Sequence, residues 1–299
     1  MRSPFTGCGT ALVTPFTRDG AVDQAAVRRL GRRQIDAGVH FLVPVGTTGE
    51  SPTLTLEERA RIVEIIVEEA NGQVPILAGA GGYDTRETIH AAARMMQAGA
   101  HGLLSVTPYY NKPTQEGLFQ HYRAIAESTS LPIIVYNVPG RTGCNIEPAT
   151  VARLASISNV IGIKEASGNM TQMCEVCRLA PEGFLVLSGD DAVTLPLMAV
   201  GGCGVISVVS NEVPAEMSQM VEAAERGDFQ AARVLHARLL PLMQINFVES
   251  SPGPVKAAMA SMGLLEEVYR LPLVSPRAES KDKIGKVLKD LGLLKAALV

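Results

Sequence analysis

The sequence predicts an α/β protein, namely a (β/α)8 TIM barrel with a C-terminal helical extension. Eight short runs of mainly aliphatic residues alternate with amphipathic segments of helix length, and each of the first seven runs is followed by such a segment. Runs that are apolar throughout are typical of parallel strands whose sheet is buried on both faces. Eight such strands are what a closed barrel requires, whereas an open doubly wound sheet usually has fewer and often carries a GxGxxG turn. The nearest candidates, VGTTGES and AGAGGYD, match neither that fingerprint nor a Walker A loop.

The alternating elements follow one another without a break along the first part of the chain. The predicted strands, each containing Val, Ile or Leu, cover residues 9–15, 39–46, 74–80, 101–106, 131–137, 160–166, 183–189 and 203–209. The predicted helices between them cover residues 23–37, 56–71, 85–98, 114–129, 148–156, 170–179 and 192–200. Functional residues are expected at the C-terminal ends of the strands and in the loops that follow, because active sites of such barrels lie there.

The last 90 residues, after position 209, contain further helical patterns. These are predicted at 215–226, 229–247 and 254–262, with a basic helix at 281–295. Only the first follows the eighth strand as a barrel helix should. We therefore expect a catalytic barrel over residues 1–226 and a helical extension over 227–299 that packs on it, interrupted by the proline-rich connections SSPGP and RLPLVSP.

Composition excludes several classes of protein. The 299 residues are 46% hydrophobic and 19% charged, which is enough apolar sequence for a large core. A net charge of -3 offers no basic surface for nucleic acid. No apolar run approaches the roughly 18 residues of a membrane span, and the N-terminus lacks the apolar region of a secretory signal. The expected location is cytoplasmic.

The cysteines and histidines do not indicate a disulfide framework or a metal site. The 5 cysteines are an odd number scattered along the chain. Cys174 and Cys177 form one CxxC, but no second CxxC or close histidine pair accompanies it, so buried free thiols are the favoured interpretation. The 5 histidines are dispersed, and no metal is expected.

A lone lysine ends the sixth predicted strand. Because side chains alternate between the faces of a strand, Lys164 is expected to share a face with Val160 and Gly162. Gly162 leaves the position beneath the amine without a side chain. In an apolar, partly dehydrated space the charged form of an amine is disfavoured and its pKa falls, which is the chemistry of a Schiff-base lysine. A strand-end lysine can also extend to solvent along its aliphatic stem, and Lys164 alone does not decide between the two.

Other polar residues follow the neighbouring strands. Gly46–Glu50 exposes two threonines, Thr47 and Thr48, although such a stretch can also be a simple turn. Tyr109 and Tyr110 lie together in a proline-bounded loop after the fourth strand, where at least one is expected to serve packing.

The fifth strand ends in Tyr136, which is expected to point where Lys164 points and to act as proton donor and acceptor. Arg141, in the turn that follows, could bind a carboxylate or be a solvated loop residue.

The last two predicted strands end in small and acidic residues. After the seventh strand we expect Asp190 and Asp191 to cap the following helix. The eighth strand contains Ile206 between small residues that leave room for contacts of a substrate with the backbone. Glu165 is adjacent to Lys164 but points to the opposite face of the strand, so it is not assigned as the base.

Taken in order, VGTTGES, VTPYYNKPTQEGL, YNVPGRTG, IGIKEASGN and LSGDD resemble the motifs of the dihydrodipicolinate synthase family. These enzymes are pyruvate-dependent class I aldolases that begin the diaminopimelate branch of lysine biosynthesis. The likeness extends from GTALVTPF to RLPL, so it covers essentially the whole chain.

The resemblance implies a reaction and a role for individual residues. Lys164 would form an imine with pyruvate, and the derived enamine would attack L-aspartate 4-semialdehyde to give 4-hydroxy-tetrahydrodipicolinate. Tyr136 would shuttle protons, and Thr47 would link it to Tyr110 of a neighbouring subunit. No metal or organic cofactor is implied, because the imine is the electron sink.

The resemblance also implies the substrate contacts and the assembly. Thr48 would hold the pyruvate carboxylate, Ile206 would contact pyruvate through its backbone, and Gly189 of LSGDD is assigned to the same site. Arg141 would engage the carboxylate of the semialdehyde. A homo-oligomer is implied, either a tetramer built as a dimer of dimers or a dimer, and neither nucleic acid nor a membrane is an expected partner.

Two alternative functions remain open at this stage. N-acetylneuraminate lyase and the 2-keto-3-deoxy sugar acid aldolases share the lysine, the tyrosine and the fold. Arg141 and the pair Tyr110 and Asn111 match the dihydrodipicolinate synthase pattern rather than theirs. A non-catalytic barrel is the third hypothesis, since fold alone does not determine function.

One departure from the family concerns regulation. Members that lysine inhibits bind it with residues at the places of Ser51, Leu56, Arg59, Tyr83, Glu87 and Tyr109. Sensitive enzymes have histidine at the Arg59 place and asparagine at the Tyr83 place. We therefore expect weak or absent inhibition by lysine.

Overall fold

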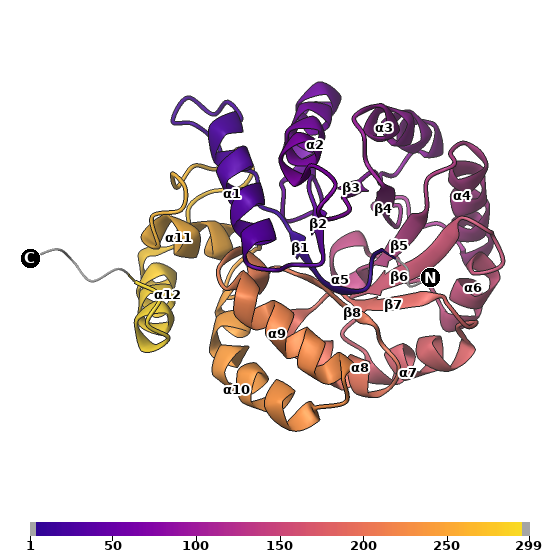
Figure 1. Cartoon of the computed structure of the whole chain (residues 1–299). Helices are drawn as coiled ribbons and strands as arrows, with labels where there is room; N and C mark the ends of the chain where they lie inside the picture. Colours follow the sequence, from indigo (N-terminus) through magenta and orange to yellow (C-terminus); the bar gives the residue numbers. More distant parts are fainter. Residues whose placement is uncertain (1–3, 295–299) are drawn as a thin grey trace, which may run out of the picture.

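The core of the molecule is one sheet of eight parallel strands (Figure 1). A computed structural model of the chain describes residues 4–294. The strands are β1 Gly7–Ala11, β2 Phe41–Val43, β3 Leu77–Gly79, β4 Gly102–Val106, β5 Ile133–Asn137, β6 Val160–Glu165, β7 Leu185–Ser188 and β8 Gly204–Ser207. Their spatial order is β2-β1-β8-β7-β6-β5-β4-β3.

The two ends of this sheet meet, so the barrel is closed. Leu42 of β2 forms a parallel bridge with Ile76, and the amide of Leu42 donates to the carbonyl of Pro75 at 3.0 Å. Closure removes the exposed strand edges that an open sheet would present. The prediction of a TIM barrel is confirmed.

Helices surround the barrel in the order of the chain (Figure 1). They are α1 Gln24–Asp36, α2 Leu56–Ala70, α3 Thr85–Gln97, α4 Gln115–Glu127, α6 Pro148–Leu154, α7 Met170–Leu179, α8 Thr194–Ala199 and α9 Pro214–Glu225. Several begin at a capping side chain. Thr55 accepts from the amide of Glu58 while Glu58 accepts from the amide of Thr55, which is the reciprocal capping box that starts α2. The side chains of Asp84 and Asn169 accept from backbone amides in the first turns of α3 and α7 and so cap these helices.

Short helices after the strands were not predicted. They are α5 Pro139–Thr142 and the 3-10 turns Ser51–Thr53, Asp191–Val193 and Val209–Asn211. Each is too short to show a 3.6-residue apolar period. The predicted helix 192–200 is instead a 3-10 turn followed by α8, so its boundaries were wrong.

Apolar side chains fill both sides of the sheet. Inside the barrel, Phe5 packs edge-on against Phe41 with ring centroids 5.7 Å apart, and an added Cβ at Gly102 would meet the Phe5 ring at 2.8 Å. Phe5 therefore plugs the end of the barrel at which the strands begin. Ile134 and Leu187 belong to the same inner cluster, and both are fully buried. A larger cluster outside the sheet joins the strands to the surrounding helices.

Strand β6 carries one irregularity. Ile133 pairs with Val160 but Ile134 pairs with Gly162, so the register shifts at this point. Val160 consequently belongs to the outer cluster and Ile161 packs against the inner one. The expectation that Val160 shares the face of Lys164 was wrong, because simple alternation does not account for a bulge. Gly162 and Lys164 do share the inner face.

The C-terminal helices are α10 Phe229–Ile245, α11 Gly253–Ser261 and α12 Ala278–Asp290. In Figure 1 they stand outside the ring, beside α9 and α1. Leu239 and Leu242 of α10 share an apolar cluster with α9 and with Ile284 of α12. The predicted helix 281–295 was misplaced: α12 starts at Ala278 and ends before Gly292, whose positive φ of 73° terminates it. Lys295 lies outside the described residues.

Polar contacts also join this extension to the barrel. Lys256 of α11 forms a buried ion pair with Glu50, with Nζ and Oε1 2.5 Å apart. Arg270 pairs with Glu58 at 2.6 Å. Asn246 donates to Glu212 at 2.6 Å.

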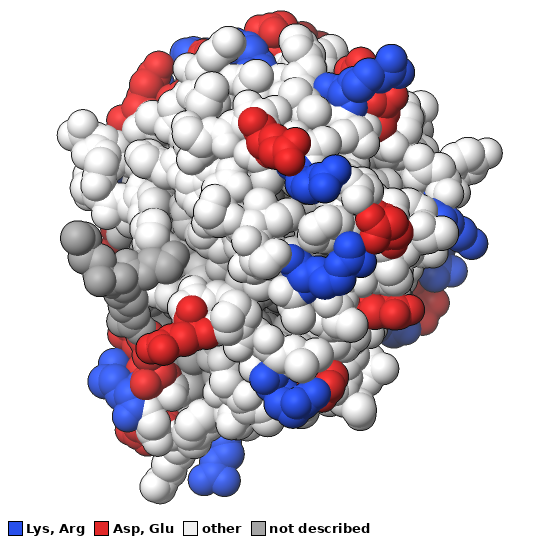
Figure 2. Space-filling model, turned by 90° about the vertical axis from the view of Figure 1, so that its right-hand side faces the viewer, with Lys and Arg blue, Asp and Glu red and all other residues white. Residues whose placement is uncertain are grey.

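Charges are mixed on the face shown in Figure 2, where lysines and arginines lie among aspartates and glutamates. No single-sign patch dominates that face. Among residues 4–294, no helix is long and apolar enough to cross a membrane.

Candidate active site

The site is built around Lys164 at the end of β6. The side chain lies on the inner face of the barrel, and the residue is only 4% exposed. Burial lowers the pKa of Lys164 from 10.5 to about 7; the carboxylate of Asp191 opposes this shift, and the Arg141 guanidinium adds to it. A substantial fraction of the amine is therefore uncharged near neutral pH. The alternative of a lysine that extends to solvent is wrong.

Tyr136 faces this amine from the neighbouring strand. The register pairs Tyr136 with Lys164, and the amine lies 4.2 Å from the centroid of the Tyr136 ring. Burial raises the pKa of Tyr136, whereas the Arg141 guanidinium and a hydrogen bond with Thr47 lower it. The phenol is therefore protonated at neutral pH and can donate to a group held at the lysine.

Thr47 and Thr48 lie in a tight loop after β2. Val45 and Glu50, which flank the loop, have left-handed backbone conformations with φ of 53° and 55°. Such values are uncommon for residues other than glycine. Within the loop the amide of Glu50 donates to the carbonyl of Thr47 at 3.1 Å, and the Thr14 hydroxyl donates to the carbonyl of Gly49 at 2.7 Å. Thr48 is 5% exposed, so the loop holds one threonine at Tyr136 and buries the next.

Arg141 stands on α5, directly after β5. Its Nη2 donates to the carbonyl of Ser251 at 3.1 Å, which ties this loop to the C-terminal extension. The side chain lines the same pocket as Thr47 and Tyr136. A guanidinium in this pocket, with part of its donor fork unused by the contact with Ser251, is suited to bind a carboxylate.

Two residues near Lys164 define the free space around it. An added Cβ at Gly189 would lie 3.0 Å from Cε and 3.2 Å from Cγ of Lys164. A side chain there would therefore compete with the lysine stem. Ile206 of β8 is fully buried in the inner cluster, so its main chain rather than its side chain is what a substrate could use.

Asp190 and Asp191 behave differently, although both were predicted to cap a helix. Asp190 does so, since its side chain accepts from the amide of Ala192 at 2.9 Å. Asp191 was predicted wrongly. Its Oδ2 accepts from the amides of Val208 and Val209 at 3.0 and 3.1 Å, and its Oδ1 has no hydrogen-bond partner among the described residues.

Asp191 supplies the negative charge that acts on Lys164. The residue is 1% exposed, and burial raises its own pKa. Adjacent acids at the end of the seventh strand were the only sequence signal for it.

Tyr110 is not brought to the site within one chain. It is 93% exposed and has a left-handed φ of 72°. Tyr109 instead lines the pocket, and its ring meets that of Tyr83 edge-on with centroids 5.3 Å apart.

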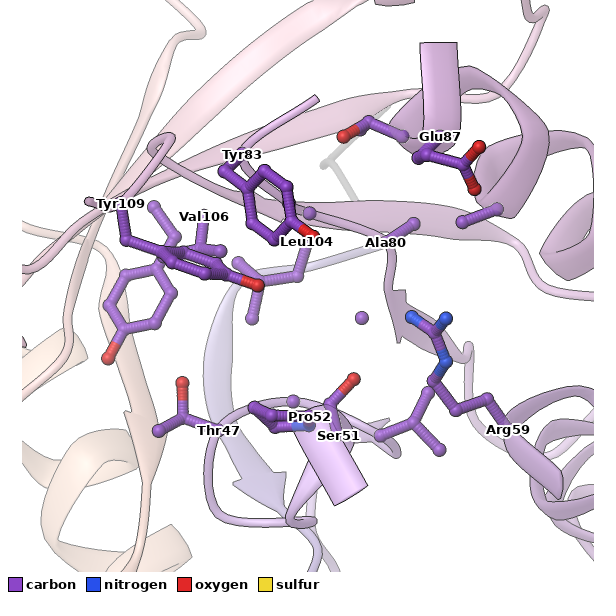
Figure 3. Close-up of a pocket in the computed structure, with 18 of the residues that line it drawn as sticks. Thr47, Ser51, Pro52, Arg59, Ala80, Tyr83, Glu87, Leu104, Val106 and Tyr109 are labelled. Atoms are coloured by element: carbon purple, nitrogen blue, oxygen red, sulfur yellow. The ribbon is translucent and has the colours of Figure 1, made fainter. Parts of the chain in front are cut away.

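A pocket of about 530 Å³ lies beside Tyr136, which lines it, whereas Lys164 is not among its lining residues. Its inner end is lined by Thr47, Tyr136 and Arg141. Its outer end is lined by Arg59, Tyr83, Glu87 and Tyr109. Figure 3 shows Arg59 and Glu87 reaching into one side, with the two tyrosines beside each other on another. Burial lowers the pKa of Arg59, and its Nε has no partner among the described residues.

Glu165 lies on the other face of β6, as expected. Its two oxygens accept from the amide of Ser167 at 2.7 Å and from Nδ2 of Asn137 at 3.0 Å. It is therefore a buried structural acceptor. All five cysteines are free, but Cys174 is exposed and Cys177 is only partly buried, so the expectation of buried thiols at this CxxC was wrong. Among residues 4–294, no group of three or more His, Cys, Asp or Glu side chains could hold a metal ion.

Known proteins are similar to this chain over nearly its whole length. The profile of the Dihydrodipicolinate synthetase family matches residues 4–291. The chain belongs to this family. A family relative, the 4-hydroxy-tetrahydrodipicolinate synthase of Koribacter versatilis, is 53% identical over 294 residues, or 98% of each chain.

Solved structures of the family superpose closely. The dihydrodipicolinate synthase of Thermotoga maritima does so with a TM-score of 0.96 at 46% identity, over 98% of this chain and 100% of that one. The chloride-inhibited enzyme of Acinetobacter baumannii, complexed with pyruvate, gives a TM-score of 0.95 at 42% identity, over 97% of this chain and 99% of that one. The family resemblance noted in the sequence is confirmed.

The close packing of Gly162, below Lys164, against the next strand yields a first prediction. An added Cβ at Gly162 would lie 2.6 Å from Cβ and 2.7 Å from the carbonyl oxygen of Leu185 on the next strand. In Gly162→Leu the added side chain must therefore push β6 away from Leu185 of β7, which displaces the Lys164 stem at the end of β6. We expect the borohydride-trapped adduct with pyruvate, the 2-oxo acid that the family resemblance implies, to form roughly 10- to 100-fold more slowly.

Gly285→Ala is the control, because an added Cβ there meets no atom within 4 Å. Circular dichroism would establish that both variants are folded. Gly162→Ala, which adds the same Cβ without further bulk, is assayed if leucine prevents folding. An unchanged rate of adduct formation in folded Gly162→Leu would show that the assigned geometry is wrong.

The lowered pKa of Lys164 yields a second prediction. Only the free amine reacts with acetic anhydride, so the rate of Lys164 acetylation should rise with pH and level off above about 7. Peptide mass analysis would measure it, with the exposed Lys286 as reference for the reagent. A rate still rising through about pH 9, as for an ordinary lysine, would contradict the burial argument.

Proposed function

We propose that this chain is a 4-hydroxy-tetrahydrodipicolinate synthase, which condenses pyruvate with L-aspartate 4-semialdehyde in lysine biosynthesis by the diaminopimelate route. The observation that carries the proposal is the Lys164 amine, buried on the inner face of β6 beside Tyr136, with its pKa lowered to about 7. Relatives that bear this activity share about half of the sequence over nearly its full length.

The first half of the reaction uses Lys164 as nucleophile. Its free amine attacks C2 of pyruvate to give a carbinolamine, and loss of water leaves the imine. Tyr136, protonated and facing the amine, donates the proton that lets hydroxide leave as water. The phenolate left on Tyr136 then takes a proton from the methyl group; the C–H electron pair forms the C=C bond of the enamine, and the imine π pair moves onto nitrogen. This makes a metal or organic cofactor unnecessary in the proposed mechanism.

Pyruvate is held at the floor of the site. We assign the Thr48 hydroxyl and amide to its carboxylate and the main chain at Ile206 to its other contacts. Gly189 is assigned to the same site because its lack of a side chain makes room for the Lys164 stem.

The second half uses the enamine as carbon nucleophile. It attacks the aldehyde carbon of the semialdehyde, whose carboxylate is held by Arg141, and the alkoxide that forms takes a proton from the Tyr136 hydroxyl. The amine of this substrate then attacks the imine carbon, displaces Lys164 and closes the ring. The enzyme is regenerated with its free lysine.

Tyr110 completes the proton path from a second copy of the chain in this proposal. A tyrosine that is 93% exposed on a left-handed residue is held away from its own barrel. Thr47 would link the Tyr110 of a neighbouring subunit to Tyr136. We therefore propose a homo-oligomer, a tetramer built as a dimer of dimers, located in the cytoplasm. We also propose that residues 1–226 form the catalytic unit and 227–299 an extension of it.

The central test combines trapping with a condensation assay. Borohydride added with pyruvate should leave a stable adduct on Lys164, detected by peptide mass analysis, and Lys164→Met should lose both the adduct and condensation with the semialdehyde. Lys286→Met, an exposed lysine, is the control and should retain both. Failure to trap an adduct on folded wild-type protein would refute a lysine-dependent aldolase.

A panel of other aldehydes would be assayed in parallel. Consumption of pyruvate with a sugar aldehyde but not with aspartate 4-semialdehyde would favour another aldolase activity.

The outer end of the pocket leads to a prediction about regulation. The Arg59 cation and the Tyr83 ring occupy it, which disfavours an incoming ammonium group even though Glu87 and Tyr109 remain. We expect weak or absent inhibition by lysine in a steady-state assay. The double variant Arg59→His, Tyr83→Asn should be inhibited more strongly than the wild type. Half-inhibition of the wild type below millimolar lysine would overturn this prediction.

A further inference from the structure

A second lysine is buried far from the reacting amine. Lys256 lies on α11 of the C-terminal extension, and its side chain is 0% exposed. Its Nζ is 2.5 Å from Oε1 of Glu50, which is equally buried. The ring of Phe16 lies 4.4 Å from the ammonium and that of Tyr269 lies 5.1 Å from it. The cation is thus enclosed by one carboxylate and two aromatic faces.

Glu50 is the last residue of the loop that carries Thr47 and Thr48. Its left-handed φ of 55° is costly for a residue with a side chain. The amide of Glu50 donates to the carbonyl of Thr47, so its backbone is coupled directly to that of the threonine. Whatever holds the Glu50 side chain therefore holds Thr47 in place.

The same part of the extension reaches a second site loop. The Ser251 carbonyl accepts from Arg141 at 3.1 Å, and the Tyr269 hydroxyl donates to the carbonyl of Gly253 at 3.0 Å. The start of α11 is thereby anchored next to both Arg141 and the loop after β2.

Stability alone does not account for such an ion pair. Desolvation of two charges cancels much of their attraction, and an apolar pair of similar size is often at least as stable. What an apolar pair cannot supply is a fixed direction. The Lys256 ammonium pairs with the Glu50 carboxylate, and this contact constrains where the Glu50 side chain lies.

We propose that Lys256 is a positioning residue, which through Glu50 fixes the loop after β2 and so holds the Thr47 hydroxyl at Tyr136. The C-terminal extension then acts in catalysis as well as in packing. This role rests on the proposed function, because the Lys256–Glu50 pair would affect the proton transfer at Tyr136 and the contact of Thr48 with pyruvate.

The test compares three variants of the full chain with the wild type. Lys256→Met and Glu50→Gln each remove one charge, and the double variant removes both and leaves no unpaired buried charge. Asn246→Ala is the matched control, since it also removes a buried contact between the extension and a barrel carboxylate, that of Glu212, away from the loop after β2. Thermal unfolding establishes the folded fraction, and kcat and KM are expressed per folded molecule.

We expect the double variant to be folded, with kcat roughly 10- to 100-fold below the wild type and a raised KM for pyruvate. The hydrogen bond with Thr47 lowers the pKa of Tyr136, so its loss should move the pH dependence of kcat to higher pH. Asn246→Ala should lose stability while its kcat and pH profile stay as in the wild type. If Lys256→Met does not fold, the double variant decides by itself.

A folded double variant with the kcat and pH profile of the wild type would overturn the proposal and leave the pair a structural contact. A loss of kcat in Asn246→Ala equal to that in the double variant would also overturn the proposal, because any lost contact between the extension and the barrel would then lower kcat. Absence of condensation by the wild type would refute the proposed function itself. The two failures are therefore distinguishable.

Discussion

The site depends on the removal of one amine from water. Lowering the pKa of Lys164 from 10.5 to about 7 corresponds to roughly 5 kcal/mol against the charged form. That energy is comparable to the net stability of a whole domain. A closed barrel can bear it because its interior is filled from below by side chains such as Phe5 and Phe41, which are fully buried.

Lys256 is also buried, but unlike Lys164 it forms a direct ion pair. Burial lowers its pKa as well, but the charge of Glu50 and the hydrogen bond to it act in the opposite direction. The carboxylate that acts on Lys164, Asp191, is shared with the amides of Val208 and Val209. One lysine is thus kept available as a nucleophile, and the other is held by a direct ion pair.

The loops above the barrel receive their shape from distant parts of the chain. The loop with Thr47 and Thr48 is flanked by two left-handed residues and contacted by α11, and the loop with Arg141 is contacted by Ser251. Within one chain this leaves Tyr110 turned outward and Tyr136 in contact with Thr47. The same pocket is also lined by Arg59, so Tyr136, Arg141 and Arg59 face one connected space.

The sequence by itself determined the barrel, because apolar runs and helical periods are local signals that repeat along the chain. It also placed Lys164, Tyr136 and Thr47 at strand ends, since strand order and alternation follow from the pattern. It misassigned Val160, because a bulge between β5 and β6 arises from pairing that no single strand encodes.

Only the tertiary structure decided the partners of buried charges. Asp191 meets amides 17 and 18 residues away, and Lys256 meets a carboxylate 206 residues away. Such pairs leave no periodic trace in the sequence, because the free energy of a buried charge depends on which groups the fold brings within a few ångströms. The chain pattern therefore predicts where the Lys164 amine lies, and the packed fold determines its charge.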